Sequence, residues 1–385
     1  MTKRFYVIAA IAALIVIQAA TAFAIVEPRG TEETFDIATW NVEQFPKRGQ
    51  RTIDTLAILI NDLELDLIAM QEITDTLAFR DLVSQLDGWE GLYSPDYSGL
   101  KTGVLYRTDQ VTVVSWEPIF WNEGWEFPRP PIRLTIEVEL PSGRFDFFLI
   151  VMHLKAMSDE TSQERRRLAI LMLKDYLDEL VPYLPEQDWL IVGDWNDQLD
   201  DPEADNVFWP LLQDDLYHFL TLPMAGNPYW SSYPYLNSLI DHIMVTTDAL
   251  DEYGLDGLTE TLRLDDDYSN YDYVISDHRP VMSQFTDLPT TIDDETPLPT
   301  DFGLTSYPNP FNASANIAFS LENSSSARID IYDCLGRHQQ TLIDKHLQAG
   351  HYSAKFNADD LPSGMYFAKL TTGDRTAVIK LNLIK

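Results

Sequence analysis

The sequence predicts an α/β domain of two packed sheets with helices outside them, followed by a small all-β domain. From residue 35 onward strand-like apolar runs alternate with a few amphipathic helical segments, and after an acidic interruption at 286–301 only short strands follow. The balance of acidic and basic residues also changes at this acidic interruption. The 385 residues carry a net charge of −34, yet residues 302–385 hold 8 basic and 7 acidic residues, which leaves 19 and 54 for residues 1–301. The two parts therefore differ in composition as separate domains do.

The first 24 residues have the pattern of a secretory signal peptide. Lys3 and Arg4 precede an apolar run from Phe5 to Ala20, and Ala22-Phe23-Ala24 fits a small-x-small cleavage site. The alternative is an uncleaved membrane anchor, because the run is close to spanning length. The single cysteine, Cys334, allows no intrachain disulfide and does not indicate a compartment.

Residues 25–285 form the predicted α/β domain. Its strand-like segments are FDIATWN, LIAMQEI, TGVLYR, VTVVSW, IRLTIEVEL, FDFFLIVMHLK, WLIVGDWND, LIDHIMV and PVMSQF. Helical spacing appears in TIDTLAILINDLELD and again over residues 162–181, where an apolar stripe opposes a charged face. Many strands with few helices favour two sheets packed face to face.

The remaining residues divide into a linker and a second domain. Residues 286–301 contain three prolines and five acidic residues with no base, a composition typical of an extended, solvated linker. Residues 302–385 contain SANIAFSL, ARIDIYD, HYSAKFN, GMYFAKLTT and TAVIKLNLI, separated by turns that carry Gly or Asp. This pattern predicts a small all-β, immunoglobulin-like sandwich.

Polar side chains recur where apolar strand-like runs end in the first domain. The run YVIS, which is interpreted as a strand, is likewise followed by polar residues, Asp277 and His278. Clustered carboxylates repel one another unless a cation holds them, so six such sites favour a shared metal centre. Oxygen ligands suit Mg²⁺, with Mn²⁺ or Ca²⁺ as alternatives, and neighbouring imidazoles suit attack of water on a phosphate ester. The residues are Asn41, Glu43, Glu72, His153, Asp194, Asn196, Asp241, Asp277 and His278.

The motifs WNVEQF, MQEI, MHLKA, GDWND, IDHIMV and SDHRPV resemble, in order and spacing, those of the endonuclease/exonuclease/phosphatase superfamily, whose members include DNase I-like nucleases. The resemblance spans about residues 35–287. It implies a four-layer αββα sandwich with the active site at one end of the two sheets. It also implies that Glu72 ligates the metal with Asn41 beside it, and that Asp277 serves the same metal site.

The resemblance also implies the catalytic residues. His278 is expected to contact the scissile phosphate or to activate water, and Asp241 to orient His278. Asp194 and Asn196 are expected to position the nucleophile and the phosphate oxygens. His153 is expected to stabilise charge in the transition state or to assist the leaving group. Arg129 is expected to bind the substrate phosphate. The general base is left unassigned.

Two features depart from the DNase I-like branch. In that branch a glutamate partners the imidazole that corresponds to His153, but the matching segment here, DYSGLKTG, contains no glutamate. In that branch an arginine often follows the QE motif, but here Ile73 and Thr74 follow it. An aromatic-rich insertion separates GDWN from IDHI. Its rings could stack on unpaired bases or meet a lipid surface, although core packing explains most of them.

The second domain contains YPNPFN, IYDCLGR, LPSGMYFAKL and a terminal KLNLIK, which resemble the C-terminal sorting domain of the type IX secretion system. The resemblance implies interaction with that machinery and a secreted or cell-surface location. The alternative is a binding module of immunoglobulin-like shape.

Together these features predict a secreted, metal-dependent phosphodiesterase, and an extracellular endonuclease acting on DNA or RNA is favoured. Strong acidity argues against a broad basic surface for nucleic acid, but a metal can still bind a phosphodiester. Two alternatives stay open: a phosphomonoesterase or lipid/inositol phosphodiesterase, and a non-catalytic surface adhesin.

Overall fold

The computed structural model describes residues 25–385 apart from 96–98, 182–183, 185, 290–303, 308, 310, 322–323, 334, 348–349, 359–360 and 374. The predicted signal peptide and most of the predicted linker lie outside the described residues. None of the helices in the described part of the chain is long and apolar enough to cross a membrane.

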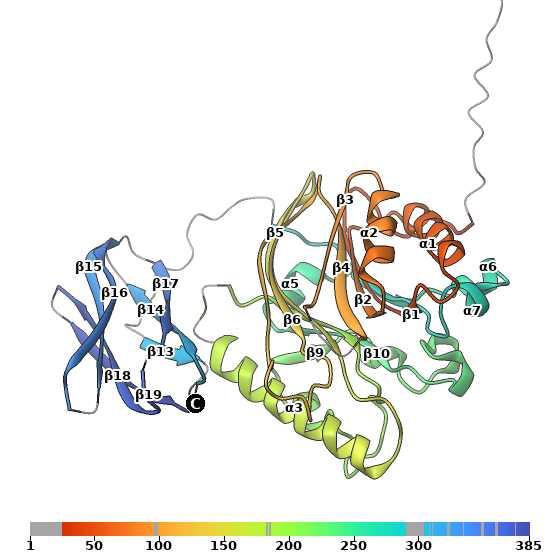
Figure 1. Cartoon of the computed structure of the whole chain (residues 1–385). Coiled ribbons are helices and arrows are strands. Elements are labelled where there is room, and N and C mark those ends of the chain that lie inside the picture. Colours follow the sequence, from red (N-terminus) through yellow and green to blue (C-terminus); the bar gives the residue numbers. More distant parts are fainter. Residues whose placement is uncertain are drawn as a thin grey trace, which may run out of the picture.

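Two six-stranded mixed sheets form the first domain (Figure 1). The first sheet has the order β11 (Leu258–Thr261), β12 (Val281–Phe285), β1 (Phe35–Phe45), β2 (Leu67–Ile73), β4 (Lys101–Arg107) and β3 (Trp89–Tyr93). The second has the order β5 (Val111–Pro118), β6 (Ile132–Leu140), β7 (Gly143–His153), β8 (Trp189–Asp194), β10 (Asp241–Thr246) and β9 (Tyr217–Phe219). β1 is parallel to β2 and β7 is parallel to β8, so within each sheet two neighbouring strands end on the same side.

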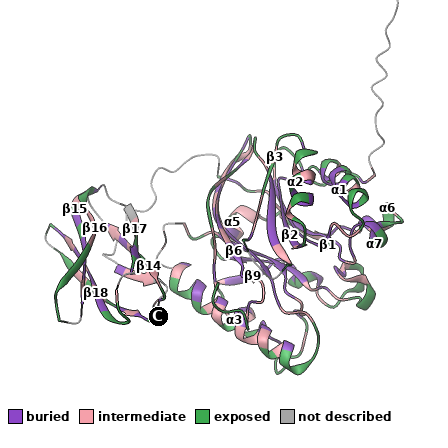
Figure 2. Ribbon diagram, in the orientation of Figure 1, coloured by how far each residue is buried: buried purple, intermediate pink, exposed green. Residues whose placement is uncertain are grey.

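Helices cover the outer faces of both sheets. Residues of α1 (Gln50–Leu63) and α2 (Thr76–Ser84) pack with the outer side chains of the first sheet, and α3 (Glu160–Leu180) packs on the second. A third apolar cluster, which includes Phe35, Phe147 and Phe285, fills the space between the sheets. The central strands are buried along most of their length (Figure 2). The predicted four-layer αββα sandwich is confirmed.

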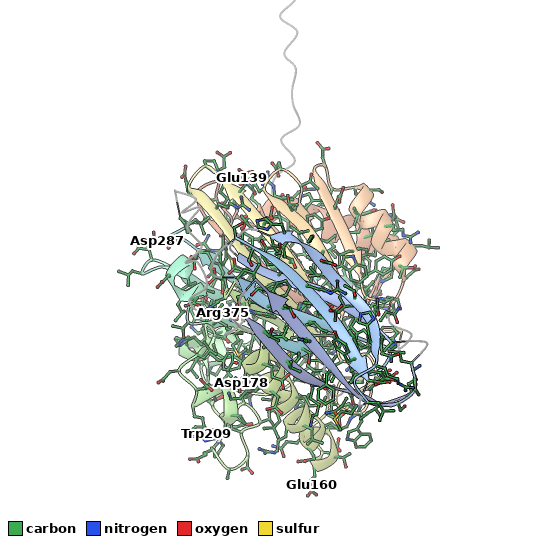
Figure 3. All side chains as sticks on the ribbon, turned by 90° about the vertical axis from the view of Figure 1, so that its left-hand side faces the viewer. Glu139, Glu160, Asp178, Trp209, Asp287 and Arg375 are labelled. Carbon is green, nitrogen blue, oxygen red and sulfur yellow. The ribbon has the colours of Figure 1, made fainter. Side chains whose placement is uncertain are left out.

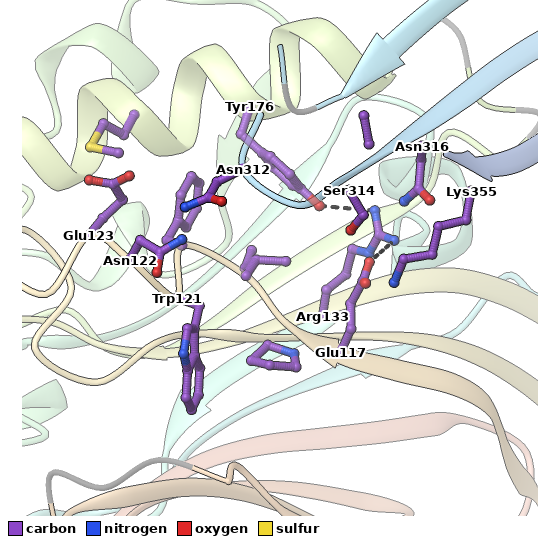
Figure 4. Close-up of a pocket in the computed structure, with 15 residues that line it drawn as sticks. Glu117, Trp121, Asn122, Glu123, Arg133, Tyr176, Asn312, Ser314, Asn316 and Lys355 are labelled. Carbon is purple, nitrogen blue, oxygen red and sulfur yellow. Dashed lines mark hydrogen bonds and ion pairs between the residues drawn. The ribbon is translucent and has the colours of Figure 1, made fainter. Parts of the chain in front are cut away.

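Polar contacts fix α3 to its sheet. The Tyr176 hydroxyl of α3 accepts a hydrogen bond of 2.9 Å from Nη1 of Arg133, and the same guanidinium forms an ion pair with Glu117 (Figure 4). Nearer the start of the helix, Arg166 is almost fully buried on the stripe that also carries Ala169 and Ile170.

The short helical elements lie in the connections. They are α4 (Trp209–Leu212), α5 (Ala249–Tyr253), α6 (Leu264–Asp267), α7 (Tyr271–Val274) and the 3₁₀ turns η2 (Leu222–Met224), η3 (Pro228–Trp230) and η4 (Pro234–Leu236). The interpretation of YVIS as a strand is wrong, because its first two residues are the end of α7 and its last two form a turn and an irregular segment. A short apolar run has the same composition in a buried strand and in a buried helical turn, so periodicity could not separate them.

The first domain continues past the last strand. Leu288 is buried in the cluster between the sheets, and the carbonyl of Pro289 accepts a hydrogen bond of 3.0 Å from the amide of Arg144. The packed chain therefore extends a few residues beyond the predicted boundary at 285.

The second domain is all-β, as predicted. One antiparallel sheet contains β13 (Leu304–Tyr307), β14 (Ser314–Leu321) and β17 (Gly350–Asn357). The other contains β16 (His338–Leu347), β15 (Ser325–Asp333), β18 (Gly364–Thr372) and β19 (Thr376–Leu383). Alternate residues, among them Ile317, Ile329 and Leu370, form one apolar core.

Candidate active site

Strand ends from both sheets bring the predicted polar residues to one rim of the first domain. Asn41 lies in the last part of β1 and Glu72 in the last part of β2. His153 and Asp194 are the last residues of β7 and β8, and they are paired in register. The first residue of β10, Asp241, pairs with Asp194 in the antiparallel direction. The register of the second sheet therefore places three polar side chains side by side.

One cluster of contacts joins the two sheets. Nδ2 of Asn41 donates to Oδ2 of Asp194 at 2.9 Å and lies 3.4 Å from Oε1 of Glu72. Nε2 of His153 lies 3.4 Å from Oδ2 of Asp194 and 3.9 Å from Oε1 of Glu72. The four predicted residues thus converge, although they are distant in the sequence.

Left-handed backbone occurs at this rim. Glu43, Gln44, Glu72 and Asn196 all have positive φ, which costs a non-glycine residue roughly 1 kcal/mol or more. The amide of Gln44 donates to Oε2 of Glu72 at 3.0 Å, so the unusual conformation aims a backbone donor at the carboxylate. Such strain is typical of sites where side-chain position matters more than stability.

A buried acid–imidazole pair forms the floor of the site. Nδ1 of His278 donates to Oδ2 of Asp241 at 2.8 Å, and Nε2 of His278 faces Oδ2 of Asp194 at 4.0 Å. Burial alone would lower the pKa of His278, but the Asp241 and Asp194 carboxylates outweigh it and raise that pKa to about 10. Burial and the Asp241 charge raise the pKa of Asp194 to about 7. The imidazole is therefore held as an imidazolium.

The loop that carries His278 is fixed by a serine that the sequence analysis did not identify. Oγ of Ser276 donates to the carbonyl of Asn41 at 2.6 Å and accepts from the amide of His278 at 3.0 Å. The Tyr271 hydroxyl donates to the carbonyl of His278 at 2.6 Å. The only sequence signal for Ser276 was its position directly before the acid–imidazole pair, since its partner Asn41 is 235 residues away.

Asp277 lines the same cavity from a different side. Its amide donates to Oε2 of Glu43 at 2.9 Å, and Lys47 pairs with that carboxylate. Burial raises the pKa of Asp277 to about 6. Among the described residues, one group of three acidic and histidine side chains has ligand atoms that all lie within 4.8 Å of one another, and it consists of Asp194, Asp241 and His278. The assignment of Asp277 to the metal stays a prediction.

Asn196 and Arg129 meet at one carbonyl. Nδ2 of Asn196 and Nη1 of Arg129 both donate to the oxygen of Leu154, at 3.2 and 3.0 Å. The amide of Asn196 donates to Oδ1 of Asp194 at 3.0 Å. Asn196 lines the cavity, whereas Arg129 lies behind Leu154 and is not one of its lining residues. A direct role for Arg129 in phosphate binding also stays a prediction.

His153 is neutral. Burial and the nearby Arg129 guanidinium lower its pKa well below the ordinary value. Its Nδ1 is buried without a hydrogen-bond partner in the part of the chain that the structure describes. This orphaned nitrogen is where the glutamate missing from the sequence motif would be expected to bind.

Arg279, next to the pair, forms a bidentate ion pair with Asp265 at 2.6 Å and its amide donates to the carbonyl of Ser232 at 2.7 Å. It therefore stabilises the loop and does not enter the cavity.

The donor set fits a hard divalent cation. The half-buried carboxylate of Glu72 and the buried carboxylate of Asp194 both contact Asn41 and His153, and Oδ1 of the neighbouring Asp241 has no partner among the described residues. Arg166 and Lys47 each pair with a different carboxylate, Asp197 and Glu43. Like charges at this spacing are stabilised by a cation, and oxygen ligands suit Mg²⁺, Mn²⁺ or Ca²⁺.

Comparison with known proteins identifies the family. Residues 38–278 match the model of the endonuclease/exonuclease/phosphatase family, and residues 305–384 match that of the secretion system C-terminal sorting domain. Among curated proteins, a type II secretion system protein K of Pseudomonas aeruginosa is 30% identical over 176 residues. The match covers 42% of this chain, and the chain spans about half the length of that relative.

Similar folds occur among solved structures. A D. rerio TDP2 complexed with single strand DNA product has a TM-score of 0.50 at 15% identity, covering 66% of this chain and 98% of that one. A mannosyl-6-phosphatase of Bacteroides thetaiotaomicron has a TM-score of 0.47 at 16% identity, covering 65% and 98%. The chain belongs to the endonuclease/exonuclease/phosphatase family, as a phosphoric ester hydrolase with a C-terminal sorting domain that directs it to the cell surface or out of the cell.

Proposed function

We propose that the protein is a divalent-cation-dependent phosphodiesterase, and that DNA or RNA is its substrate. The observation that carries the proposal is the Asp241–His278 pair beside Asp194, at the floor of a cavity lined by further carboxylates. A nucleophile, a proton acceptor and a proton donor can meet there within one small volume.

The residues supply the proton transfers of hydrolysis. Water attacks phosphorus and loses a proton, for which the Asp194 carboxylate is suited because its pKa is raised to about 7. His278 holds its proton, so its Nε2–H can stabilise charge that develops on a phosphoryl oxygen. The P–O bond to the leaving group breaks, the leaving oxygen takes up a proton from solvent water, and Asp194 returns the proton that it accepted to solvent.

The resident cation would be held by Glu72 with Asn41 beside it, and Asp277 is the further candidate ligand. A bound cation would supply Lewis-acid polarisation of the phosphoryl oxygens. Asn196, anchored to Leu154 and Asp194, would orient the phosphate oxygens.

A phosphomonoesterase, or a lipid or inositol phosphodiesterase, is the second candidate. One observation favours it: the excess of 54 acidic over 19 basic residues in 1–301 repels long polyanions. A small phosphate ester carries less charge into this field than a nucleic acid does.

A substrate panel tests the proposal. The full chain is assayed with plasmid DNA, single-stranded DNA, RNA, sphingomyelin and inositol phosphates, each with Mg²⁺ and with excess chelator. We expect nucleic acid cleavage that chelator abolishes and Mg²⁺ restores. His278→Ala should lose at least ~10³-fold in turnover, within the range of acid–base contributions. His218→Ala, whose ring bonds Thr247 outside the cavity, is the matched control.

Cleavage of lipid or inositol phosphate alone would replace the nuclease by the second candidate. No hydrolysis of any substrate would favour a non-catalytic surface protein. Full activity in excess chelator would contradict the metal centre.

A further inference from the structure

The cavity that holds the acid–imidazole pair has an apolar rim. Tyr233, Leu236 and Ile240 line it from the insertion before β10, and Ala156 and Met157 line it from the segment after β7. Leu236 and Met157 are 72% and 70% exposed, which is unusual for large apolar side chains beside a group of carboxylates. Exposed apolar side chains at the mouth of a polar cavity mark a place where a ligand's apolar surface is buried.

Most rings of the aromatic-rich insertion pack elsewhere. Phe208 and Tyr217 are buried in the core beneath α3, and Trp209 lies at the outer surface (Figure 3). Tyr229 is covered by the Arg263 guanidinium at 4.7 Å. Core packing therefore explains only part of the insertion, although most of its rings were expected to pack in this way. Phe208, Tyr217 and the partly buried Trp230 pack on the core, whereas Trp209, Tyr229 and Tyr235 are exposed.

Tyr233 has a different environment. Its ring centroid lies 5.0 Å from that of His278, at an interplanar angle of 48°, and it is the ring of the insertion that lines the cavity. Tyr235 lies 5.9 Å from Tyr233 and is 61% exposed. Tyr233 thus stands beside His278, where the phosphate is expected to bind, and Tyr235 packs against Tyr233.

The segment that carries these rings is fixed before any ligand binds. The amide of Tyr233 donates to the carbonyl of Ser238, and the reverse bond closes a two-strand bridge. The buried hydroxyl of Ser232 accepts from the amides of Ile240 and Asp241, both at 3.1 Å. The rim is therefore tied directly to the residue that orients His278, and a preorganised surface binds with less entropic cost.

The segment that carries Met157 is fixed by Arg166. Its Nη1 donates to the carbonyls of Lys155 and Met157, both at 2.7 Å, and its Nε pairs with Asp197 at 2.8 Å. Met157 has a φ of 83°, a conformation that costs a side-chain-bearing residue free energy. A buried arginine and a strained backbone together hold an exposed methionine at the cavity mouth.

We propose that Tyr233, Leu236 and Met157 form a subsite for the base of the nucleotide whose phosphate reacts. The inference rests on the proposed function and specifies its substrate as unpaired. A planar base can pack on these apolar side chains, and stacking on an aromatic side chain such as Tyr233 accepts any base. A base inside a duplex does not expose its faces in this way. The acidic surroundings of the patch, with Glu43 and Asp197 on the same cavity, disfavour an anionic membrane.

Binding measurements test the subsite without requiring turnover. The Kd of thymidine 5′-monophosphate and that of deoxyribose 5-phosphate, which differ by the base, are measured by calorimetry on the full chain in Mg²⁺. We expect the base to tighten binding at least ~10-fold, about 1.4 kcal/mol. The ratio of the two Kd values should fall toward one in Leu236→Asn and in Met157→Ser. Leu255→Asn changes a fully exposed leucine outside the cavity and should keep the wild-type ratio.

Equal affinity of the wild type for both ligands would overturn the subsite, as would an unchanged ratio in both rim variants. The outcome is separate from that of the substrate panel, since a Kd ratio can be read from a protein that hydrolyses nothing. A base-dependent Kd with no hydrolysis would leave the subsite standing and reject the phosphodiesterase. Hydrolysis together with equal Kd values for the two ligands would support the phosphodiesterase and reject the subsite.

Discussion

Replacement of one buried carboxyl, Asp66→Asn, should change stability in a way that depends strongly on pH. Asp66 is 1% exposed at the start of β2. Its Oδ2 accepts from the amide of Asp36 at 2.8 Å, and its Oδ1 has no partner among the described residues. Burial raises the pKa of Asp66 from 3.8 to about 8. Asparagine keeps the shape and the acceptor but cannot ionise.

Proton linkage determines the sign and the size of this pH dependence of the free energy of unfolding. A carboxyl whose pKa is raised on folding stabilises the folded state fully below the unfolded pKa, and this contribution is lost as pH rises toward the folded pKa. Each pH unit in that window is worth about 1.4 kcal/mol. Between pH 5 and pH 8 the free energy of unfolding of the wild type should therefore fall by about 4 kcal/mol relative to that of Asp66→Asn.

Urea unfolding followed by tryptophan fluorescence measures this difference. All 9 tryptophans lie in residues 1–301, so the signal reports the first domain. Asp109→Asn removes a largely exposed carboxylate near Arg107 and is the matched control, for which no comparable pH dependence is expected. A stability difference between wild type and Asp66→Asn that stays within about 1 kcal/mol from pH 5 to pH 8 would refute the reasoning.

Three further changes test the site. Asp241→Asn removes the carboxylate that charges His278, so turnover should fall by ~10²–10⁴-fold and the pH–rate profile should shift; an unchanged profile would exclude the pair from the reaction. Arg166→Met leaves the half-buried Asp197 without its partner, and urea unfolding should show a loss of about 3 kcal/mol or more; wild-type stability would mean that the ion pair contributes little. Ser276→Ala removes the bridge between Asn41 and His278 and should cost about 1–3 kcal/mol, whereas Ser276→Thr should retain part of it; equal loss in both variants would argue against the bridge.

The architecture was predictable because each layer has its own periodicity. Period-two and continuous apolar runs gave the strands of both sheets, and the stripe through residues 162–181 gave α3. Polar residues at strand ends gave the rim, since parallel strands such as β1 and β2 end on one side. Local sequence also contained a signal for Arg166, which lies four residues after Ser162 and three before Ala169 on the buried stripe.

Other features depend on contacts that local sequence does not contain. The pairing of Asp241 with Asp194 follows from the register of β10 against β8, 47 residues apart. The anchoring of Ser276 on Asn41 crosses most of the domain. The helical turn α7 could not be distinguished from a strand, because a four-residue run is too short to show helical or strand periodicity.

The metal site is tested most directly by the position of a divalent cation in crystals of the full chain grown with Mn²⁺. An anomalous difference peak is expected at the rim where the two sheets meet, at ligand distance from a Glu72 carboxylate oxygen and close to Asn41 and Asp194. A Mn²⁺-saturated crystal with no peak in this cavity, or with its peak bound only to surface carboxylates elsewhere, would contradict this metal site.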